Sequence, residues 1–373
     1  MTTTLNSTYL FPNSGESARA WLYQVYLIAK EIGFRSVNID FYIAIVAVLV
    51  SSCHLVVLTR KAMITSSVIT ILIAVAILNI ISLTITIKSK SMMYETEGTP
   101  CSPPATLLSF RIFWFTIAIR DMVHRASTWL GVLMALIRFA ALRFAMNPVF
   151  VRMSKPKFGV YAALGTLMTS SVLSVFYWLR YDLVEQGFWT PNPNCSDYSP
   201  ATMEPVVTQI PSKLFTENGG IIGRTFMFIN GSASKILPCI LLPLLSALLI
   251  LQLRKAKNVR GQLTSSEKDK KTEKTTALVI LMAISFFITE IPIGTALVFQ
   301  VAYTDIGFLY LATYVNHLCN ALHTTNSITQ CLIFFFMSSQ YRTTIRSLFR
   351  RERRSQIVSE NGKSAGRTFA SGK

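Results

Sequence analysis

Charged side chains are scarce in this sequence. Asp, Glu, Lys and Arg make up 14% of its 373 residues, whereas hydrophobic residues make up 51%. Soluble globular domains carry about 25% charged residues. The scarcity therefore argues against an ordinary soluble protein and indicates an integral membrane protein, in which each spanning helix needs roughly 20 apolar residues.

Several other patterns are missing. The start "MTTTLNSTYLFPNSGESARAW" has no basic region followed by an apolar stretch and a cleavage site, so the first spanning helix is expected to direct insertion. The four histidines are scattered, which disfavours a membrane hydrolase, and His317 and His323 do not share a ligand face, so no metal or cofactor is expected. No lysine between residues 306 and 341 could form a retinal Schiff base. Inverted repeats and paired broken helices, typical of transporters, are also absent from the sequence.

Charge-poor runs predict an all-α membrane protein with a seven-transmembrane helix bundle. A short amphipathic eighth helix is expected at 339–351, where Tyr341, Ile345, Leu348 and Phe349 recur at helical spacing. Residues 1–36 are expected to form an extracellular N-terminus that includes an interfacial helix, 182–222 the longest outer loop, and 352–373 a disordered cytoplasmic tail. The seven spanning helices are expected at about 37–59, 62–88, 112–142, 158–181, 224–253, 275–301 and 307–337.

Lys and Arg outnumber Asp and Glu by 36 to 18, and their distribution predicts the orientation. They collect in the segments that would be cytoplasmic if the N-terminus is extracellular, as in "RKAKNVRGQLTSSEKDKKTEK" and "RSLFRRERR". We therefore expect a multi-pass plasma-membrane protein with a cytoplasmic C-terminus. The basic excess is interpreted as topology and attraction to anionic membrane lipid, not as nucleic-acid binding.

Two of the six cysteines, Cys101 and Cys195, fall in loops, and both loops are expected outside, where thiols can oxidise. A disulfide between the second-to-third and fourth-to-fifth connections is therefore predicted. Glycosylation sequons in expected outer segments begin at Asn6 and Asn194.

The segment "AIRDMVHRASTWLGVLMALIRF", residues 118–139, is long enough to span a membrane yet contains Arg120, Asp121, His124, Arg125 and Arg138. Each full charge at a helix centre costs around 2.5 to 3.5 kcal/mol on insertion scales, so these side chains must face the bundle interior. Asp121 and Arg125 are four residues apart and can pair within the helix. The cluster from 120 to 125 lies roughly 20 to 27 Å from Arg138 along the helix. The helix therefore has two polar ends separated by a packed middle.

Four motifs resemble one receptor family. "STWLGVLMALIRF" looks like the inner half of the third helix of the nematode serpentine receptor class w family, a group of rhodopsin-like G-protein-coupled receptors similar to FMRFamide and myosuppressin neuropeptide receptors. "SASKILPCILLPLLSALLILQLRKA" resembles that family's fifth helix, "SFFITEIPIG" its sixth, and "MSSQYRTTIRSLF" its seventh-to-eighth junction. The resemblance covers about residues 36–350 and implies a receptor without catalytic activity.

The resemblance also implies roles for single residues. Arg138 takes the place of the arginine in the Asp-Arg-Tyr motif, and Asn79 that of the second-helix aspartate that helps to bind sodium, although an amide lacks its charge. Glu290 replaces the tryptophan of the sixth-helix switch, and "QCLIF" at 330–334 replaces the Asn-Pro-x-x-Tyr motif. The residues expected in activation and G-protein coupling are Arg138, Asn79, Pro238, Phe286, Pro292, Asn326, Ser327, Tyr341 and Arg342.

The expected function is a receptor that passes binding of an extracellular peptide, most simply one of the RF-amide type, to a heterotrimeric G protein. A buried carboxylate would suit the guanidinium of such a peptide as a bidentate partner. Two alternatives stay open: an environmental small-molecule or peptide chemoreceptor of the same fold, and, more remotely, a seven-helix transporter. A purely structural ion network of Asp121, Arg125 and Glu290 is an equal alternative to ligand contact. The candidate pocket residues are Arg120, Asp121, His124, Arg125, Glu290, Asn316 and His317.

Overall fold

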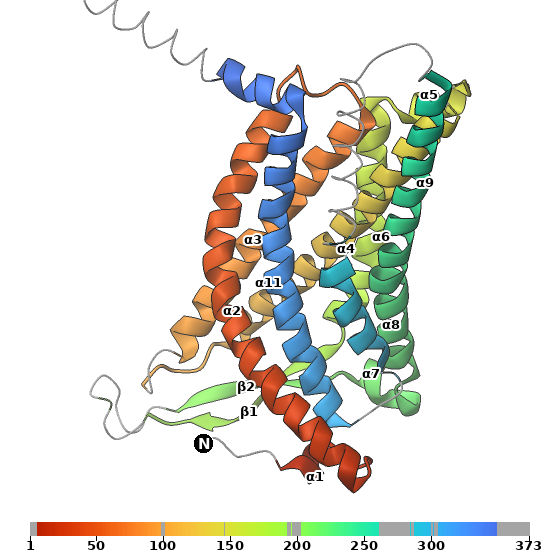
Figure 1. Ribbon diagram of the computed structural model, residues 1–373. Coiled ribbons are helices and arrows are strands. Elements are labelled where there is room, and N and C mark those ends of the chain that lie inside the picture. The colour runs from red at the N-terminus through yellow and green to blue at the C-terminus, as the bar shows by residue number, and fades with distance from the viewer. Residues whose placement is uncertain are drawn as a thin grey trace, which may run out of the picture.

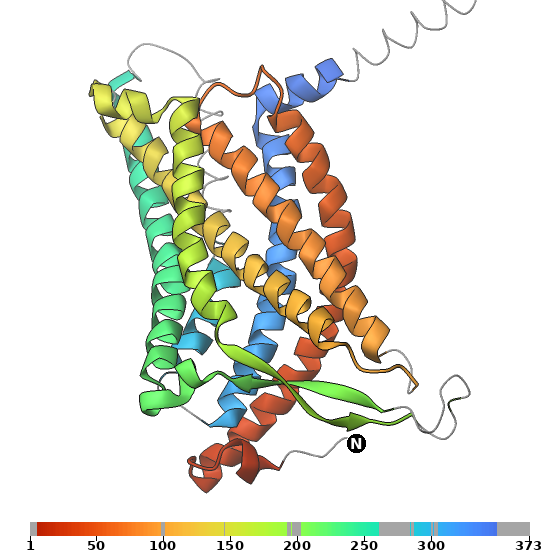
Figure 2. The same ribbon diagram turned by 180° about the vertical axis from the view of Figure 1, so that it is seen from behind.

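The structure is a computed structural model, and it describes residues 6–97, 101–144, 146–191, 195, 203–260, 284, 287–299, 301 and 305–348. Long helices run side by side along one axis and a two-stranded hairpin lies across one end (Figures 1 and 2). Five helical stretches of the described chain are long and apolar enough to cross a membrane by length and composition. A further stretch, Phe287–Phe299, and α11, Ile306–Met337, complete the bundle. The predicted all-α membrane fold is confirmed.

Apart from the first and fifth, the long helices have bounds that differ from the expected ones by up to nine residues. The long helices are α3 (Ser67–Glu97), α4 (Leu107–Arg143), α6 (Pro156–Trp178) and α9 (Leu237–Arg260), with short helices α1 (Ser7–Leu10), α5 (Pro148–Met153), α7 (Lys213–Thr216) and α8 (Ile221–Gly231). Helix starts follow local capping chemistry. The Thr106 side chain accepts from Ser109 N at the start of α4, and Pro148 and Pro156 occupy first turns, where a missing N–H costs nothing.

The first long helix differs from the prediction. α2 runs without a break from Glu16 to Leu58, so the expected interfacial helix and the spanning helix expected at 37–59 are one element. Its 43 residues correspond to about 65 Å, roughly twice the hydrocarbon thickness of a bilayer. The extension is held by α11, because Gly33 lets the Tyr314 side chain approach closely. Tertiary packing therefore continues a helix that the hydropathy pattern divides.

The loop expected at 182–222 also differs, because it contains regular structure. β1 (Tyr181–Trp189) pairs antiparallel with β2 (Glu204–Pro211), and the register shifts between Glu185 and Phe188. Gly187 sits in this irregularity with φ 81°, a conformation that favours glycine. We call this end of the bundle, which also carries α1, the hairpin end, and the opposite end, with α5 and the helical residues 339–348, the tail end (Figure 1).

The fifth helix is not uniform. α8 continues into a π-helical segment, η2 (Ser232–Ile236), and then into α9. A π segment inside an α-helix changes the direction of the side chains around it and is frequent at functional sites. Here it places Lys235, which is buried, toward the bundle interior.

The main apolar core fills the tail-end half of the bundle. It joins α2, α3, α4 and α11, with Leu58, Ile71 and Leu130 fully buried. At the hairpin end a smaller cluster seats Leu10 and Phe11 of the N-terminal segment against Tyr26. The polar interior lies between these two clusters.

Candidate functional site

A cavity of about 350 Å³ lies within the bundle beneath the hairpin. Its walls come from α4, α6, β1, β2, α8, η2, α11 and the stretch Phe287–Phe299. The polar and charged residues that line it are Arg120, Asp121, His124, Arg180, Gln209, Asn230, Lys235, Thr313, Asn316, His317 and Asn320. Five of the seven predicted pocket residues therefore meet in one cavity: Arg120, Asp121, His124, Asn316 and His317.

One wall of the cavity is aromatic. The Trp114 ring stacks on Tyr177 with centroids 5.4 Å apart and meets Tyr181 edge-on at 5.2 Å. The Trp114 indole donates to the Trp178 carbonyl oxygen at 3.0 Å, which fixes the ring. Phe113 lines the same cavity from α4. This wall is therefore aromatic, and it adjoins the polar and charged residues that line the rest of the cavity.

Arg125 does not line the cavity, contrary to the pocket prediction. Its side chain is 2% exposed and donates to the Ser170 carbonyl oxygen at 2.9 Å and to Ser174 Oγ at 3.1 Å. It also pairs with Asp121 one turn earlier, as the spacing predicted, and donates to Asn230 Oδ1 at 3.3 Å. Arg125 thus connects α4 to α6 and α8. These contacts favour a structural role for Arg125 over contact with a ligand.

Glu290 also lies behind the cavity lining, and its partner is a residue that sequence reasoning missed. Lys235 Nζ is 2.8 Å from Glu290 Oε2, and both side chains are buried. Thr128 donates to Glu290 Oε1 at 3.4 Å, and His323 Nδ1 lies 3.8 Å from the same oxygen. The sequence did contain a signal for Lys235, because a lysine within an apolar spanning helix must face the interior. Only the fold shows which carboxylate it meets.

Two histidines stack beside the cavity, and one of them, His124, lines it. The rings of His124 and His323 lie 4.2 Å apart at 31°, and His124 Nε2 contacts Ser82 Oγ. Arg120, four residues before His124, forms no hydrogen bond or ion pair with any residue that the structure describes. The cavity therefore combines paired charges with one guanidinium, that of Arg120, which forms no hydrogen bond or ion pair with a described residue.

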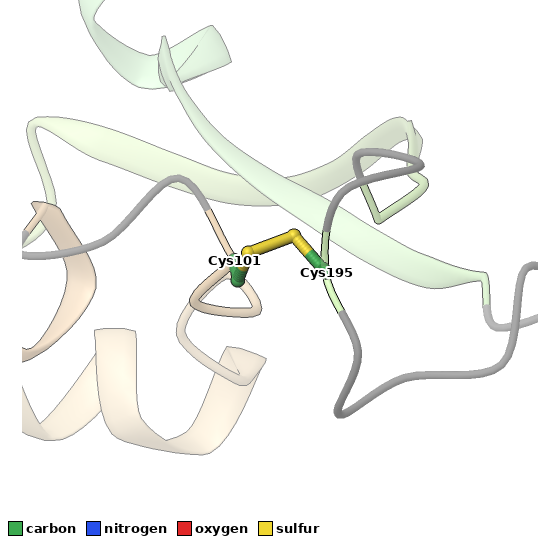
Figure 3. Close-up of a disulfide and its surroundings, with 2 residues drawn as sticks. All are labelled: Cys101 and Cys195. Carbon is green, nitrogen blue, oxygen red and sulfur yellow. A yellow bond between two sulfur atoms is a disulfide. The ribbon is translucent and has the colours of Figure 1, made fainter.

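The predicted disulfide closes the hairpin end. Cys101 and Cys195 are bonded with their Cα atoms 5.6 Å apart, and the bond ties the segment before α4 to the connection between β1 and β2 (Figure 3). The remaining described cysteines, Cys53, Cys239, Cys319 and Cys331, form no disulfide. The disulfide fixes the hairpin over the cavity.

Some of the residues expected in activation have contacts below the cavity or at the tail end. Ser127 donates to Asn79 Oδ1 at 3.3 Å, and the buried Asn326 amide forms no hydrogen bond with a described residue. Tyr341 and His54 Nδ1 are 2.9 Å apart, which joins the helix after α11 to α2. Arg138 is partly buried on α4 and forms no ion pair with a described residue. Phe286, the sequon at Asn194 and most of the loop 254–274 lie outside the described residues, whereas Asn6 is exposed at the start of α1.

Comparison with known proteins decides the family. The sequence model for the serpentine type seven-transmembrane G-protein-coupled chemoreceptor Srw matches residues 38–352, most of the chain. The chain belongs to the Srw receptor family. This Srw receptor is also similar to the G-protein coupled receptor dmsr-1 of Caenorhabditis elegans. The two are 22% identical over 352 residues, covering 83% of this chain and 67% of the relative. The family resemblance carried by the four sequence motifs is confirmed.

Proposed function

We propose that this Srw receptor is a plasma-membrane receptor for an extracellular peptide of the RF-amide type and activates a heterotrimeric G protein. The observation that carries the proposal is the cavity at the hairpin end, with its aromatic wall beside a charged floor. A volume of about 350 Å³ is at the small end of ligand pockets, so it would take the terminal residues of a peptide while the rest contacts the hairpin.

The chemistry of an Arg-Phe-amide end suits several of these groups. A phenyl ring can pack on Trp114 and Tyr177, and the guanidinium can approach Asp121, the carboxylate that lines the cavity. Both carboxylates have a cationic partner, Asp121 with Arg125 and Glu290 with Lys235. Only Asp121 also lines the cavity, so Asp121 is the better candidate for a ligand cation.

The proposed orientation places the hairpin end outside the cell. Arg143, Arg152, Lys155 and Lys157 lie at or beside α5, at the tail end, where an excess of basic residues is typical of cytoplasmic loops. Glycosylation at Asn6 follows from the same orientation. A glycosidase-sensitive shift in gel mobility that disappears in Asn6→Gln would support it. Access of antibody to a C-terminal tag in intact cells would contradict it.

A peptide-library screen tests the function. Cells expressing the receptor, and matched cells without it, are exposed to peptides that include RF-amides, and G-protein activation is recorded. A response that requires the receptor and the Arg-Phe-amide end supports the proposal. No response to any peptide would favour a small-molecule chemoreceptor, a second candidate that the modest cavity volume and the family's chemoreceptor description favour.

A further inference from the structure

Among the residues that the structure describes, the charges around the cavity do not cancel. Arg120, Lys235 and Arg180 line it, with Arg125 directly behind, and together they supply four cations. Two nearby carboxylates carry the opposite charge, and each is already paired: Asp121 with Arg125, and Glu290 with Lys235. Arg180 lies over the Tyr181 ring, 5.0 Å from its centroid. The remaining cation is Arg120.

Arg120 has one further counter-charge among the described residues. The carboxylate of Asp40 on α2 interacts with it electrostatically, but Asp40 is buried, does not line the cavity and accepts from Thr324 Oγ1 at 2.6 Å. The neighbours of Arg120 on the cavity surface include His124 and His317, which carry no negative charge. With Asp40 included, these four cations still face only three carboxylates among the described residues.

The position of Arg120 beside the aromatic wall narrows the ligand chemistry. Phe113, Ile117, Arg120 and His124 recur at spacings of four, three and four residues and all line the cavity, so they form one stripe of α4. A ring resting against Phe113 and Trp114 would bring an attached oxygen toward the Arg120 guanidinium. Guanidinium offers five N–H donors, and its hydrogen bonds are strengthened where water is excluded.

We propose that Arg120 is the anchor for a carbonyl or carboxylate oxygen next to an aromatic ring, and that the cavity rejects a ligand whose inserted end is cationic. This inference rests on the proposed function, because it requires that the ligand enters this cavity. It adds which end of the ligand is inserted. For an RF-amide peptide, the terminal Phe-amide oxygen meets Arg120, and the preceding arginine can approach Asp121, the next residue of α4.

Three small probes with a common phenyl group test the anchor on the purified full-length receptor in lipid nanodiscs: N-acetylphenylalanine, N-acetylphenylalaninamide and 2-phenylethylammonium. Direct binding is measured for wild type, Arg120→Met, Arg120→Lys and Arg111→Met. Arg111 is an exposed residue on the same helix that does not line the cavity, so its variant is the matched control. Thermal melting checks that each variant is folded.

In wild type the two oxygen-bearing probes should bind at least about tenfold more tightly than the ammonium, the ratio expected for one charge-assisted hydrogen bond. Arg120→Met should remove this preference, Arg120→Lys should keep part of it, and Arg111→Met should keep all of it. The proposal is overturned if the ammonium binds as well as the others, if neither oxygen-bearing probe binds, or if Arg120→Met retains the preference. If the three probes bind with the expected order of affinities but cells show no response to peptides, the proposed function is overturned and the role of Arg120 is not.

Discussion

Lys235 and Glu290 form a buried ion pair between the fifth and sixth helices, with 2.8 Å between Nζ and Oε2. Thr128 and His323 approach the same carboxylate from α4 and α11, so elements from four parts of the bundle meet at one group. The pair lies at the floor of the cavity, where Lys235 forms part of the lining. A ligand that displaces Lys235 would therefore alter contacts of the sixth helix directly.

Breaking this pair from one side should destabilise the receptor strongly. Glu290→Gln leaves the Lys235 ammonium buried without its counter-charge, a situation that costs about 3 to 5 kcal/mol. Thermal unfolding of the purified receptor measures the loss. The double variant Lys235→Met/Glu290→Met should recover most of it, because no unpaired charge stays buried. The exposed pair of Arg35 and Glu31 provides the control, and Glu31→Gln should change stability by less than about 1 kcal/mol. A double variant as unstable as the single one would contradict the pairing.

Two glycines allow the fifth and sixth helices to approach beside that pair. A Cβ on Gly294 would lie 2.9 Å from the Cβ of Lys235, and one on Gly231 would lie 3.0 Å from the Gly294 carbonyl oxygen. We expect Gly294→Ala to lower the free energy of unfolding by about 1 to 3 kcal/mol, since the backbone must move apart.

Gly165 on α6 is the matched control for this substitution, because nothing lies within 4 Å of a Cβ there. Gly165→Ala should leave stability unchanged or raise it by about 0.5 to 1 kcal/mol through helix propensity. Equal melting temperatures for the Gly294→Ala and Gly165→Ala receptors would argue against a tight crossing.

Replacing either cysteine of the disulfide should lower stability as much as replacing both. Cys101→Ser and Cys195→Ser each open the same bond, so each should lose about 2 to 4 kcal/mol of stability and the double variant should lose no more. Antibody staining of intact cells measures surface delivery, with Cys53→Ser, a free cysteine, as the control. Normal delivery and normal ligand response in both single variants would show that the bond has no role in the receptor.

Arg138→Ala should impair signalling while leaving folding largely intact. The side chain is only partly buried and has no ion-pair partner among the described residues, so its removal leaves no opposite charge stranded. Binding of a labelled ligand should therefore persist while nucleotide exchange on the G protein falls. Unchanged G-protein activation would remove the role assigned to Arg138 by family resemblance.

Local sequence features predicted the fold well where the structure of a helix depends only on its own residues. α11 begins one residue from its predicted start and ends at the predicted residue, because an apolar run of membrane length leaves little choice of structure. The Asp121 to Arg125 pair also follows from spacing within one helix. The hairpin and the extension of α2 were missed, because strand pairing and packing against Tyr314 involve residues distant in sequence.

The amino-acid sequence by itself determined that this chain enters a membrane as helices, that charged residues of the third helix face inward, and that Cys101 pairs with Cys195. Those outcomes follow from the cost of leaving charge or backbone polar groups in lipid and from the few cysteines in loops. Only the tertiary structure decided that Glu290 meets Lys235, that Arg125 is sealed between helices, and that Arg120 faces the cavity. The reason is physical, because insertion energy requires each charge to face inward but does not choose its partner, which the rotation and crossing of packed helices select.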